Sequence, residues 1–239
     1  DPDGKKVGGN TFEHSGTADA KQSTCAVAMQ LLGVKPWTAE TPHLYTVRVV
    51  QKDAQGREEM AFSTKYGFRH IEIKNSLVYI NGQKVLFKGV NRHEHHPRTG
   101  RYVDEATLRK DLEMMKQANI NMIRTSHYPS MPLFYELCDE YGFYVMSDAN
   151  NESHDYGIGN RILGNDPMWK KAFLGRAVSL VQRDRNHPCV LFWSLGNESI
   201  GGDNAKAMAD TVKAMDPRRI VFYDSDRSVS ELYDDSYLA

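Results

Sequence analysis

Several short apolar runs of this 239-residue chain end in residues whose side chains can take part in chemistry. Each run is followed at once by histidines, carboxylates or amides, which can transfer protons, bind metal ions or hydrogen-bond to hydroxyl groups. These polar clusters lie at 91–96, 124–128, 148–154, 197–199 and 224–226. Five of the nine histidines fall in the first three clusters. This concentration favours one functional site over five unrelated loops.

Glu198 is the most distinctive of these residues, because it follows the nearly unbroken apolar run LFWSLG at 191–196 and stands beside Asn197. A buried carboxylate without a partner costs several kcal/mol, or its pKa shifts until it is neutral. Considered alone, Glu198 is equally well explained as a solvated loop residue. Partial desolvation raises the pKa of a carboxylic acid, which suits a general acid.

Two hydrolytic chemistries can use such residues. The pair His93 and His95, with later histidines, is typical of binuclear metal hydrolases, which need nitrogen ligands on several strands and a bridging lysine. The fourth run ends in Asn197 and Glu198 instead, which fits that site poorly. Glycoside hydrolysis needs two carboxylates around the scissile bond, one of them protonated, and Glu198 suits that acid role.

The elements that must position these residues fall into two regions. Residues 1–79 predict β-structure, with strands at 25–32, 44–53 and 58–75 separated by turn sequences. From residue 80 on, apolar runs alternate with segments of helical period. Strands are predicted at 84–90, 120–126, 143–148, 189–196 and 220–225, and helices at 104–119, 132–142, 166–186 and 203–216.

The strands of the second region lack strict alternation, which predicts burial on both faces and therefore a parallel sheet. Parallel α/β folds carry their chemistry at the carboxyl ends of the strands, where all five polar clusters fall. Asp104, Asp166 and Asp203 each precede a helical pattern and are predicted to cap those helices. Trp193 lies within an apolar run and is expected in the core.

Composition limits the class of partner. The chain is 40% hydrophobic and 26% charged, with a formal net charge of -1, so it has no electrostatic footprint for nucleic acid or an anionic membrane. No apolar run approaches the roughly 18 residues that span a bilayer.

Three cysteines form no CxxC pair, and we expect Cys138 and Cys189 to be buried free thiols. This usage mildly favours a reducing compartment, and we expect a cytoplasmic location.

Four motifs resemble, in order and spacing, the central barrel of family 2 glycoside hydrolases, and above all its β-galactosidase branch. They are GVNRHEHHPRTGR (89–101), NMIRTSHYP (121–129), FYELCDEYGFYVMSDANNESH (134–154) and VQRDRNHPCVLFWSLGNES (181–199). The residues from VKPW at 34–37 onward resemble the end of that family's immunoglobulin-like domain. The resemblance implies a (β/α)8 TIM barrel at 80–239, with about the first five βα units present. It also implies the C-terminal part of an immunoglobulin-like β-sandwich at 1–79.

The resemblance further implies a retaining glycosidase that cleaves terminal β-D-galactosides, such as lactose. Glu198 matches the general acid/base, and the nucleophilic glutamate is expected outside this chain, so that these 239 residues alone are inactive. Asn197, His93 and His127 match residues that contact the sugar, Asn197 near its 2-hydroxyl. Glu152, His154 and Glu198 match protein ligands of Mg²⁺. A monovalent cation held outside this chain and a homo-oligomeric state are also implied.

The chain departs from the family pattern beside the implied metal ligands. Ser147 and Asp148 stand where Asp and Glu are expected, and Asn151 replaces an apolar residue before Glu152. The ligands are retained while their surroundings change, which bears on metal affinity. Two alternatives stay open: a family 2 relative with another sugar preference, such as a β-glucuronidase or β-mannosidase, and a non-catalytic carbohydrate-binding fragment. The HEHH run and RTSHYP favour galactose.

Overall fold

The computed structural model describes residues 1–13, 24, 26–153, 162–199, 201–224 and 226–231. Its centre is a sheet of five strands in the order β10-β9-β8-β7-β6, in which every neighbouring pair is parallel. The strands are β6 (Gly89–Arg92), β7 (Met122–Thr125), β8 (Tyr144–Asp148), β9 (Val190–Ser194) and β10 (Ile220–Phe222). Strands that follow one another along the chain lie side by side, as in a partial (β/α) barrel, and the predicted parallel sheet is confirmed.

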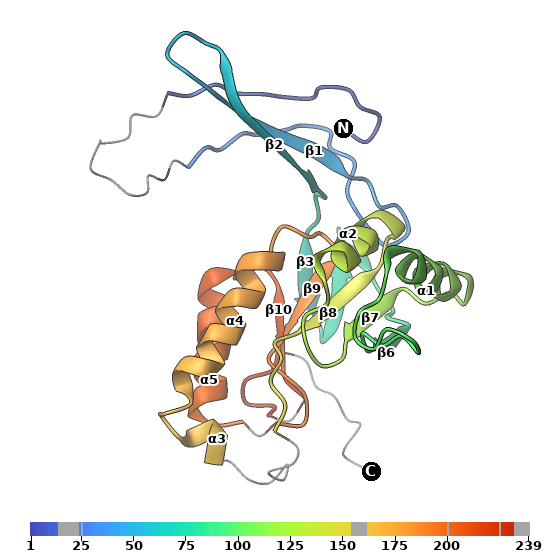
Figure 1. The fold of residues 1–239 in the computed structure, drawn as a ribbon, viewed down its shortest axis with the longest axis vertical. Helices are drawn as coiled ribbons and strands as arrows, with labels where there is room; N and C mark the ends of the chain where they lie inside the picture. The colour runs from blue at the N-terminus through green and yellow to red at the C-terminus, as the bar shows by residue number, and fades with distance from the viewer. Residues whose placement is uncertain (14–23, 25, 154–161, 200, 225, 232–239) are drawn as a thin grey trace.

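Helices connect these strands: α1 (Glu105–Gln117), α2 (Pro132–Tyr141), α3 (Ile162–Asn165), α4 (Lys170–Asp184) and α5 (Asp203–Met215). Figure 1 shows α4 and α5 together beside β10, and α1 at the opposite edge of the sheet, near β6 and β7. None of the helices in the described part of the chain combines the length and apolar character that crossing a membrane requires.

One of the three predicted helix caps is confirmed. The side chain of Asp104 accepts a hydrogen bond of 2.8 Å from the backbone of Thr107 and caps α1. The predictions for Asp166 and Asp203 were wrong, because the capping positions are Trp169 and Gly202. Asp166 closes a turn before α4 instead, and Asp203 is already helical. Gly202 has φ 141° and lies so close to Gly164 and Asn165 that a side chain would collide with them, which favours glycine at this cap.

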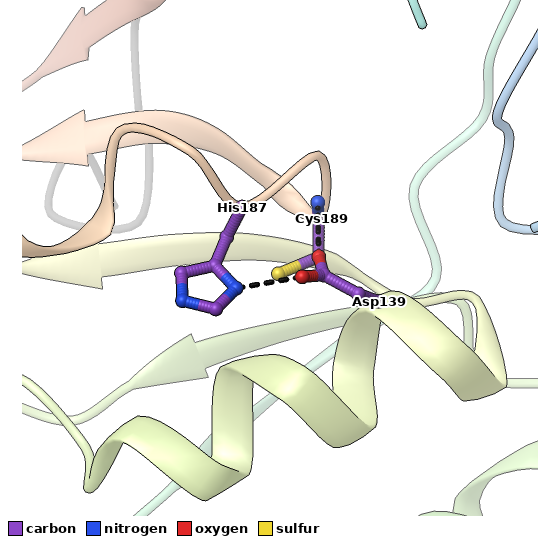
Figure 2. A group of neighbouring side chains, drawn as sticks. All are labelled: Asp139, His187 and Cys189. Atoms are coloured by element: carbon purple, nitrogen blue, oxygen red, sulfur yellow. Dashed lines mark hydrogen bonds and ion pairs between the residues drawn. The ribbon is translucent and has the colours of Figure 1, made fainter. Parts of the chain in front are cut away.

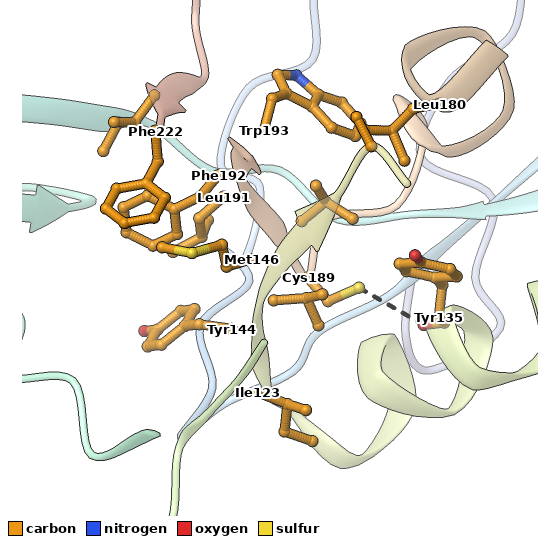
Figure 3. Close-up of a cluster of buried hydrophobic side chains, with 14 of the residues drawn as sticks. Ile123, Tyr135, Tyr144, Met146, Leu180, Cys189, Leu191, Phe192, Trp193 and Phe222 are labelled. Carbon is orange, nitrogen blue, oxygen red and sulfur yellow. Dashed lines mark hydrogen bonds between the residues drawn. The ribbon is translucent and has the colours of Figure 1, made fainter. Parts of the chain in front are cut away.

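The core lies on both faces of the parallel sheet, and all residues of β8 and β9 are buried. Trp193 is fully buried, as predicted, and its indole N–H donates to Asp216 at the end of α5. Phe192, its neighbour on the opposite face, stacks edge-on against Phe87. Figure 3 shows Phe192 near Met146 and Phe222, with Trp193 turned away from them. Each such large apolar side chain stabilises the fold by about 1.5–3 kcal/mol when fully buried.

The N-terminal region forms two small antiparallel sheets. β1 (Tyr45–Lys52) and β2 (Glu58–Tyr66) make a hairpin that extends away from the parallel sheet (Figure 1). β3 (Ile71–Lys74), β4 (Leu77–Ile80) and β5 (Gln83–Lys84) make the second sheet.

Three sequence predictions for strands were wrong in detail. The described part of 25–32 forms no strand, and its side chains Val27 and Met29 are exposed. The predicted strand at 58–75 is split, because Gly67 packs against Trp37 and Pro188 where a side chain would not fit. The first barrel strand begins at Gly89 rather than at residue 84.

Hydrogen bonds from side chains to backbone oxygens join the N-terminal region to the amino end of the parallel sheet. The indole N–H of Trp37, which is fully buried, donates to the backbone oxygen of Asp139 at 3.0 Å. The guanidinium of Arg69 donates to the backbone oxygens of Pro188 at 2.5 Å and Val190 at 2.6 Å. Lys116 donates to the backbone oxygen of Ala39 at 3.0 Å. These bonds lie at the end of the sheet opposite the strand ends that carry the polar clusters.

Candidate active site

The carboxyl ends of the five parallel strands carry the polar residues that the sequence singles out. His93 follows β6, His127 follows β7, Glu152 comes shortly after β8, and Asn197 and Glu198 come shortly after β9. His154 lies outside the described residues. The parallel arrangement therefore brings together side chains that are separated by more than 100 positions in the sequence.

Glu152 and Asn197 are joined across neighbouring segments. They form an isolated parallel bridge, in which the backbone N–H of Asn197 donates to the oxygen of Asn151 at 2.9 Å. The side-chain amide of Asn197 also donates to both carboxylate oxygens of Glu152, at 3.2 Å and 3.1 Å. The amide that the sequence places beside the candidate acid is thus held by a carboxylate from the neighbouring segment.

Glu198 is half-buried at this edge, with φ 35°, and its backbone N–H donates to the Asp224 carboxylate at 3.3 Å. The preceding Gly196 has φ 154°, and a Cβ there would lie 2.4 Å from the backbone oxygen of Asn151. Only glycine lets the chain turn so closely past Asn151. This turn sets the direction in which Asn197 and Glu198 leave the strand.

His93 and His127 lie against each other, with ring centroids 5.4 Å apart and planes at 87°. His93 is exposed, but partial desolvation is the first cause that lowers its pKa, and the charges of His127 and Arg101 lower it further. The Nδ1 atom of His127 is 2.9 Å from a carboxylate oxygen of Asp148. The two histidines thus pack against each other, and His127 is held by Asp148 at the end of β8.

Arg124 and Asp148 stand in two of the polar clusters of the sequence, but no role in this site was predicted for either. Nε of Arg124 lies 3.1 Å from both carboxylate oxygens of Asp148, whose side chain is fully buried. The other end of the guanidinium donates to Asn197 Oδ1 at 3.2 Å and to the oxygen of Gly196 at 3.3 Å. Both residues stand inside the motifs RTSHYP and SDANNESH, but only the fold shows that their side chains meet.

The remaining histidines of the first cluster are arranged differently. The ring Nδ1 of His96 accepts from the backbone of Thr99 at 3.2 Å, and its own backbone pairs with Gly100, so it stabilises a local turn. His95 is exposed. Neither shares a hydrogen bond with Glu152 or Asn197 in the described part of the chain.

The carboxylates of Glu152 and Glu198 are chemically suited to magnesium, which prefers oxygen ligands and keeps several waters. The Glu152–Asn197 bridge places these two glutamates on adjacent segments at the same edge of the sheet. The donor set that the sequence implies therefore fits Mg²⁺ as far as its described members go.

A second group of potential metal ligands lies at the opposite end of the sheet. Asp139, His187 and Cys189 each place a ligand atom within 4.8 Å of the others. Figure 2 shows that Asp139 instead accepts two hydrogen bonds, at 2.6 Å from His187 Nδ1 and at 2.8 Å from the backbone of Cys189. Two ligands of one zinc ion stand roughly 3.3 Å apart at ordinary bond lengths, so 2.6 Å is a hydrogen-bond distance. Burial raises the pKa of the Cys189 thiol, which further disfavours metal binding.

Comparison with protein families gives two matches. The TIM barrel domain of glycosyl hydrolases family 2 matches residues 71–238. A second model, described as glycosyl hydrolases family 2, matches residues 1–69. Together they extend over most of the described structure, including the parallel sheet and the hairpin.

Curated relatives include proteins named beta-galactosidase. One from Pectobacterium atrosepticum is 50% identical over 188 residues, which is 79% of this chain and 18% of that protein. One from Photobacterium profundum is 44% identical over 214 residues, which is 88% of this chain and 21% of that protein. The chain thus spans about a fifth of the length of these relatives.

Solved structures with the same fold include β-glucuronidases. One from Ruminococcus gnavus, in complex with uronic isofagomine, has a TM-score of 0.76 at 23% identity and covers 85% of this chain and 38% of its own. One from Bifidobacterium dentium, complexed with coumarin-3-O-glucuronide, has a TM-score of 0.72 at 25% identity, with 84% and 34% covered. The likeness to the Ruminococcus structure, below 25% identity, supports the fold alone.

Proposed function

The chain belongs to family 2 of the glycosyl hydrolases, and we propose that it supplies the general acid/base of a retaining β-galactosidase. The supporting observation is the position of Glu198. It leaves a buried strand at the carboxyl end of a parallel sheet, beside an asparagine that is bound to Glu152 and Arg124. Relatives that are 44–50% identical carry the name beta-galactosidase, which supports galactose as the sugar.

In this proposal, the Glu198 carboxylic acid donates its proton to the glycosidic oxygen as the bond to the anomeric carbon breaks. A second glutamate, which the proposal places outside these 239 residues, attacks the anomeric carbon and forms a covalent galactosyl intermediate. Glu198, now a carboxylate, takes a proton from water, and the resulting hydroxide displaces the enzyme carboxylate. The half-buried position of Glu198 is suited to a group that must hold a proton in one step and release it in the other.

The sugar would be bound by residues on both sides of Glu198. Asn197 would donate an amide N–H to the 2-hydroxyl, where hydrogen bonds strengthen in the transition state. His93 and His127, which pack together, would line the galactose ring. Glu152, His154 and Glu198 would hold Mg²⁺, whose charge would stabilise carboxylates and hydroxyls gathered at this edge. We further place a monovalent cation on residues outside this chain.

The proposal extends to the cellular location, the oligomeric state and the partner of the enzyme. Cys138 and Cys189 are both buried and free, in keeping with a reducing compartment, and we infer a cytoplasmic location. We also infer that the intact enzyme is a homo-oligomer. The partner at the active site is a β-galactoside rather than a nucleic acid or a membrane.

The test is hydrolysis of aryl β-galactosides by the intact enzyme and its Glu198→Gln variant. Loss of the general acid should lower kcat/KM about 10²–10⁴-fold for substrates with poor leaving groups, and much less for activated ones. Equal losses on both kinds of leaving group would contradict the acid role. Faster turnover of a β-glucuronide or β-mannoside than of the galactoside would contradict the sugar assignment. Magnesium-independent sugar binding without hydrolysis, unchanged in Glu198→Ala, would indicate a carbohydrate-binding module instead.

A further inference from the structure

We propose that Arg124 and Asp148 are positioning residues of the active site, forming one ion pair that orients Asn197 on one side and His127 on the other. This inference rests on the proposed function, because it concerns how the sugar-binding residues of that site are held. Neither residue needs to touch the sugar to act in this way.

The Asp148 carboxylate is fully buried, so its charge requires partners. It accepts Arg124 Nε on both oxygens, at 3.1 Å each, and lies 2.9 Å from His127 Nδ1. A carboxylate facing a guanidinium is ionised and can only accept hydrogen bonds, so His127 Nδ1 must carry a proton. This leaves Nε2 as the ring nitrogen of His127 that is free to meet a substrate hydroxyl.

At the other end of the guanidinium, Arg124 fixes the amide of Asn197. Guanidinium groups only donate, so the Asn197 atom 3.2 Å from Arg124 must be the oxygen. The carboxylate of Glu152 only accepts, so the Asn197 atom 3.1 Å from it must be the nitrogen. If the amide were flipped, its N–H groups would face the N–H groups of Arg124, and its oxygen would face the carboxylate oxygens of Glu152. The N–H donors of Asn197 are thereby held on the Glu152 side.

The contacts of Arg124 reach three neighbouring strand ends. Besides Asp148 at the end of β8 and Asn197 after β9, its guanidinium lies 3.9 Å from the Asp224 carboxylate after β10. The side chain is 14% exposed and packs over the ring of Phe222 at 5.7 Å. A lysine keeps the charge but carries all its donors on one nitrogen, so it lacks the separate nitrogens with which Arg124 binds Asp148 and Asn197.

The experiment measures how much the 2-hydroxyl of the sugar contributes to kcat/KM in the intact enzyme. The ratio of kcat/KM for an aryl β-galactoside to that for its 2-deoxy analogue reports the hydrogen bond made by Asn197. We expect Asn197→Ala to reduce this ratio about tenfold, and Arg124→Lys to reduce it by a similar factor. In the double variant the ratio should fall no further, because Arg124 acts through Asn197.

The matched control is Arg219→Lys. Arg219 is 4% exposed and donates to the backbone oxygens of Val190, Arg185 and His187 at the amino end of the sheet. This variant should lower Tm without changing the ratio. Asp148→Asn, which keeps the shape of the side chain but not its charge, should reduce the ratio. Asp148→Glu keeps the charge, so its ratio should lie between those of Asp148→Asn and the unchanged enzyme.

Three results would overturn the inference in distinguishable ways. An Arg124→Lys enzyme with lower Tm but an unchanged ratio would assign Arg124 a structural role only. The proposed function would still stand if Glu198→Gln lost activity as expected. Additive losses in the Arg124→Lys/Asn197→Ala double variant would remove the link between the two residues. An intact enzyme that hydrolyses no β-galactoside would remove the proposed function and this inference with it.

Discussion

Asp139 and His187 meet at the amino end of the parallel sheet, with Nδ1 of His187 2.6 Å from a carboxylate oxygen of Asp139. Burial alone would lower the pKa of His187. The hydrogen bond to Asp139 and its charge, with further contributions from the charges of Asp184 and Glu136, outweigh burial and raise that pKa. The pair therefore links the protonation of one histidine to the stability of the fold.

This linkage predicts how stability changes with pH. Because the folded state raises the pKa of His187, its contribution is complete below the unfolded value of about 6.5 and is lost as pH rises through the folded value. The destabilisation caused by His187→Gln should be about 1–3 kcal/mol at pH 5.5 and smaller at pH 9. Urea unfolding at both pH values measures it. The exposed His70→Gln serves as control, and an equal effect of His187→Gln at both pH values would contradict the linkage.

Trp37 is expected to hold the N-terminal region on the barrel. Its side chain is fully buried, packs edge-on against Tyr144 at 5.8 Å and donates to the backbone of Asp139. Trp37→Ala should destabilise the protein by about 3–5 kcal/mol, because it leaves a cavity and an unpaired carbonyl. Trp169→Ala, at a site that is 42% exposed, should cost about 0.5 kcal/mol or less. Denaturant unfolding compares the two, and similar losses would argue against the role of Trp37.

Gly196 is expected to tolerate no side chain. Its φ is 154°, and a Cβ at this position would lie 2.4 Å from the Asn151 oxygen, so Gly196→Ala must displace the segment that carries Asn197 and Glu198. We expect a loss of about 1–3 kcal/mol in stability and a fall in activity larger than that loss alone explains. Gly175→Ala is the control, since Gly175 lies in α4 with open space around it and should gain about 1 kcal/mol. Full activity in Gly196→Ala would contradict the steric argument.

Cys138 and Cys189 should react with thiol reagents only after unfolding. Both are buried, and burial raises the pKa of each thiol, so little thiolate is available in the folded protein. In a Cys25→Ser variant, labelling at pH 8 should be at least about 100-fold slower in buffer than in denaturant. Mass spectrometry after timed quenching measures both sites. Rapid labelling of either cysteine in buffer would show that its surroundings open readily.

The sequence predicts the barrel portion well because burial on both faces leaves a clear pattern. The run at 189–196 contains β9, and the charged or polar residues that follow each run lie at one edge of the sheet. Trp193 illustrates the same rule, since an indole in an apolar run belongs in the core.

The pattern carries no information about which charged side chains meet. Arg124 and Asp148 are 24 positions apart and lie on adjacent strands, so their ion pair depends on register rather than on local composition. The same holds for Asp139 and His187, which are 48 positions apart. The strand predicted at 25–32 failed for a related reason: apolar residues favour a strand only where neighbouring strands bury them, and Val27 and Met29 are exposed.

The hydrogen bonds at the amino end of the sheet also constrain when the N-terminal region can dock during synthesis. Arg69 is bonded to backbone oxygens 119 and 121 positions further along the chain. At roughly 5–20 residues per second, the ribosome needs about 6–24 seconds to add those positions. During that interval Arg69 has neither of these partners, whereas Asp139, the partner of Trp37, is made earlier, so the contacts of the N-terminal region are complete only after Val190 has been made. Complete docking is thus a late event for a segment that is translated before the parallel strands.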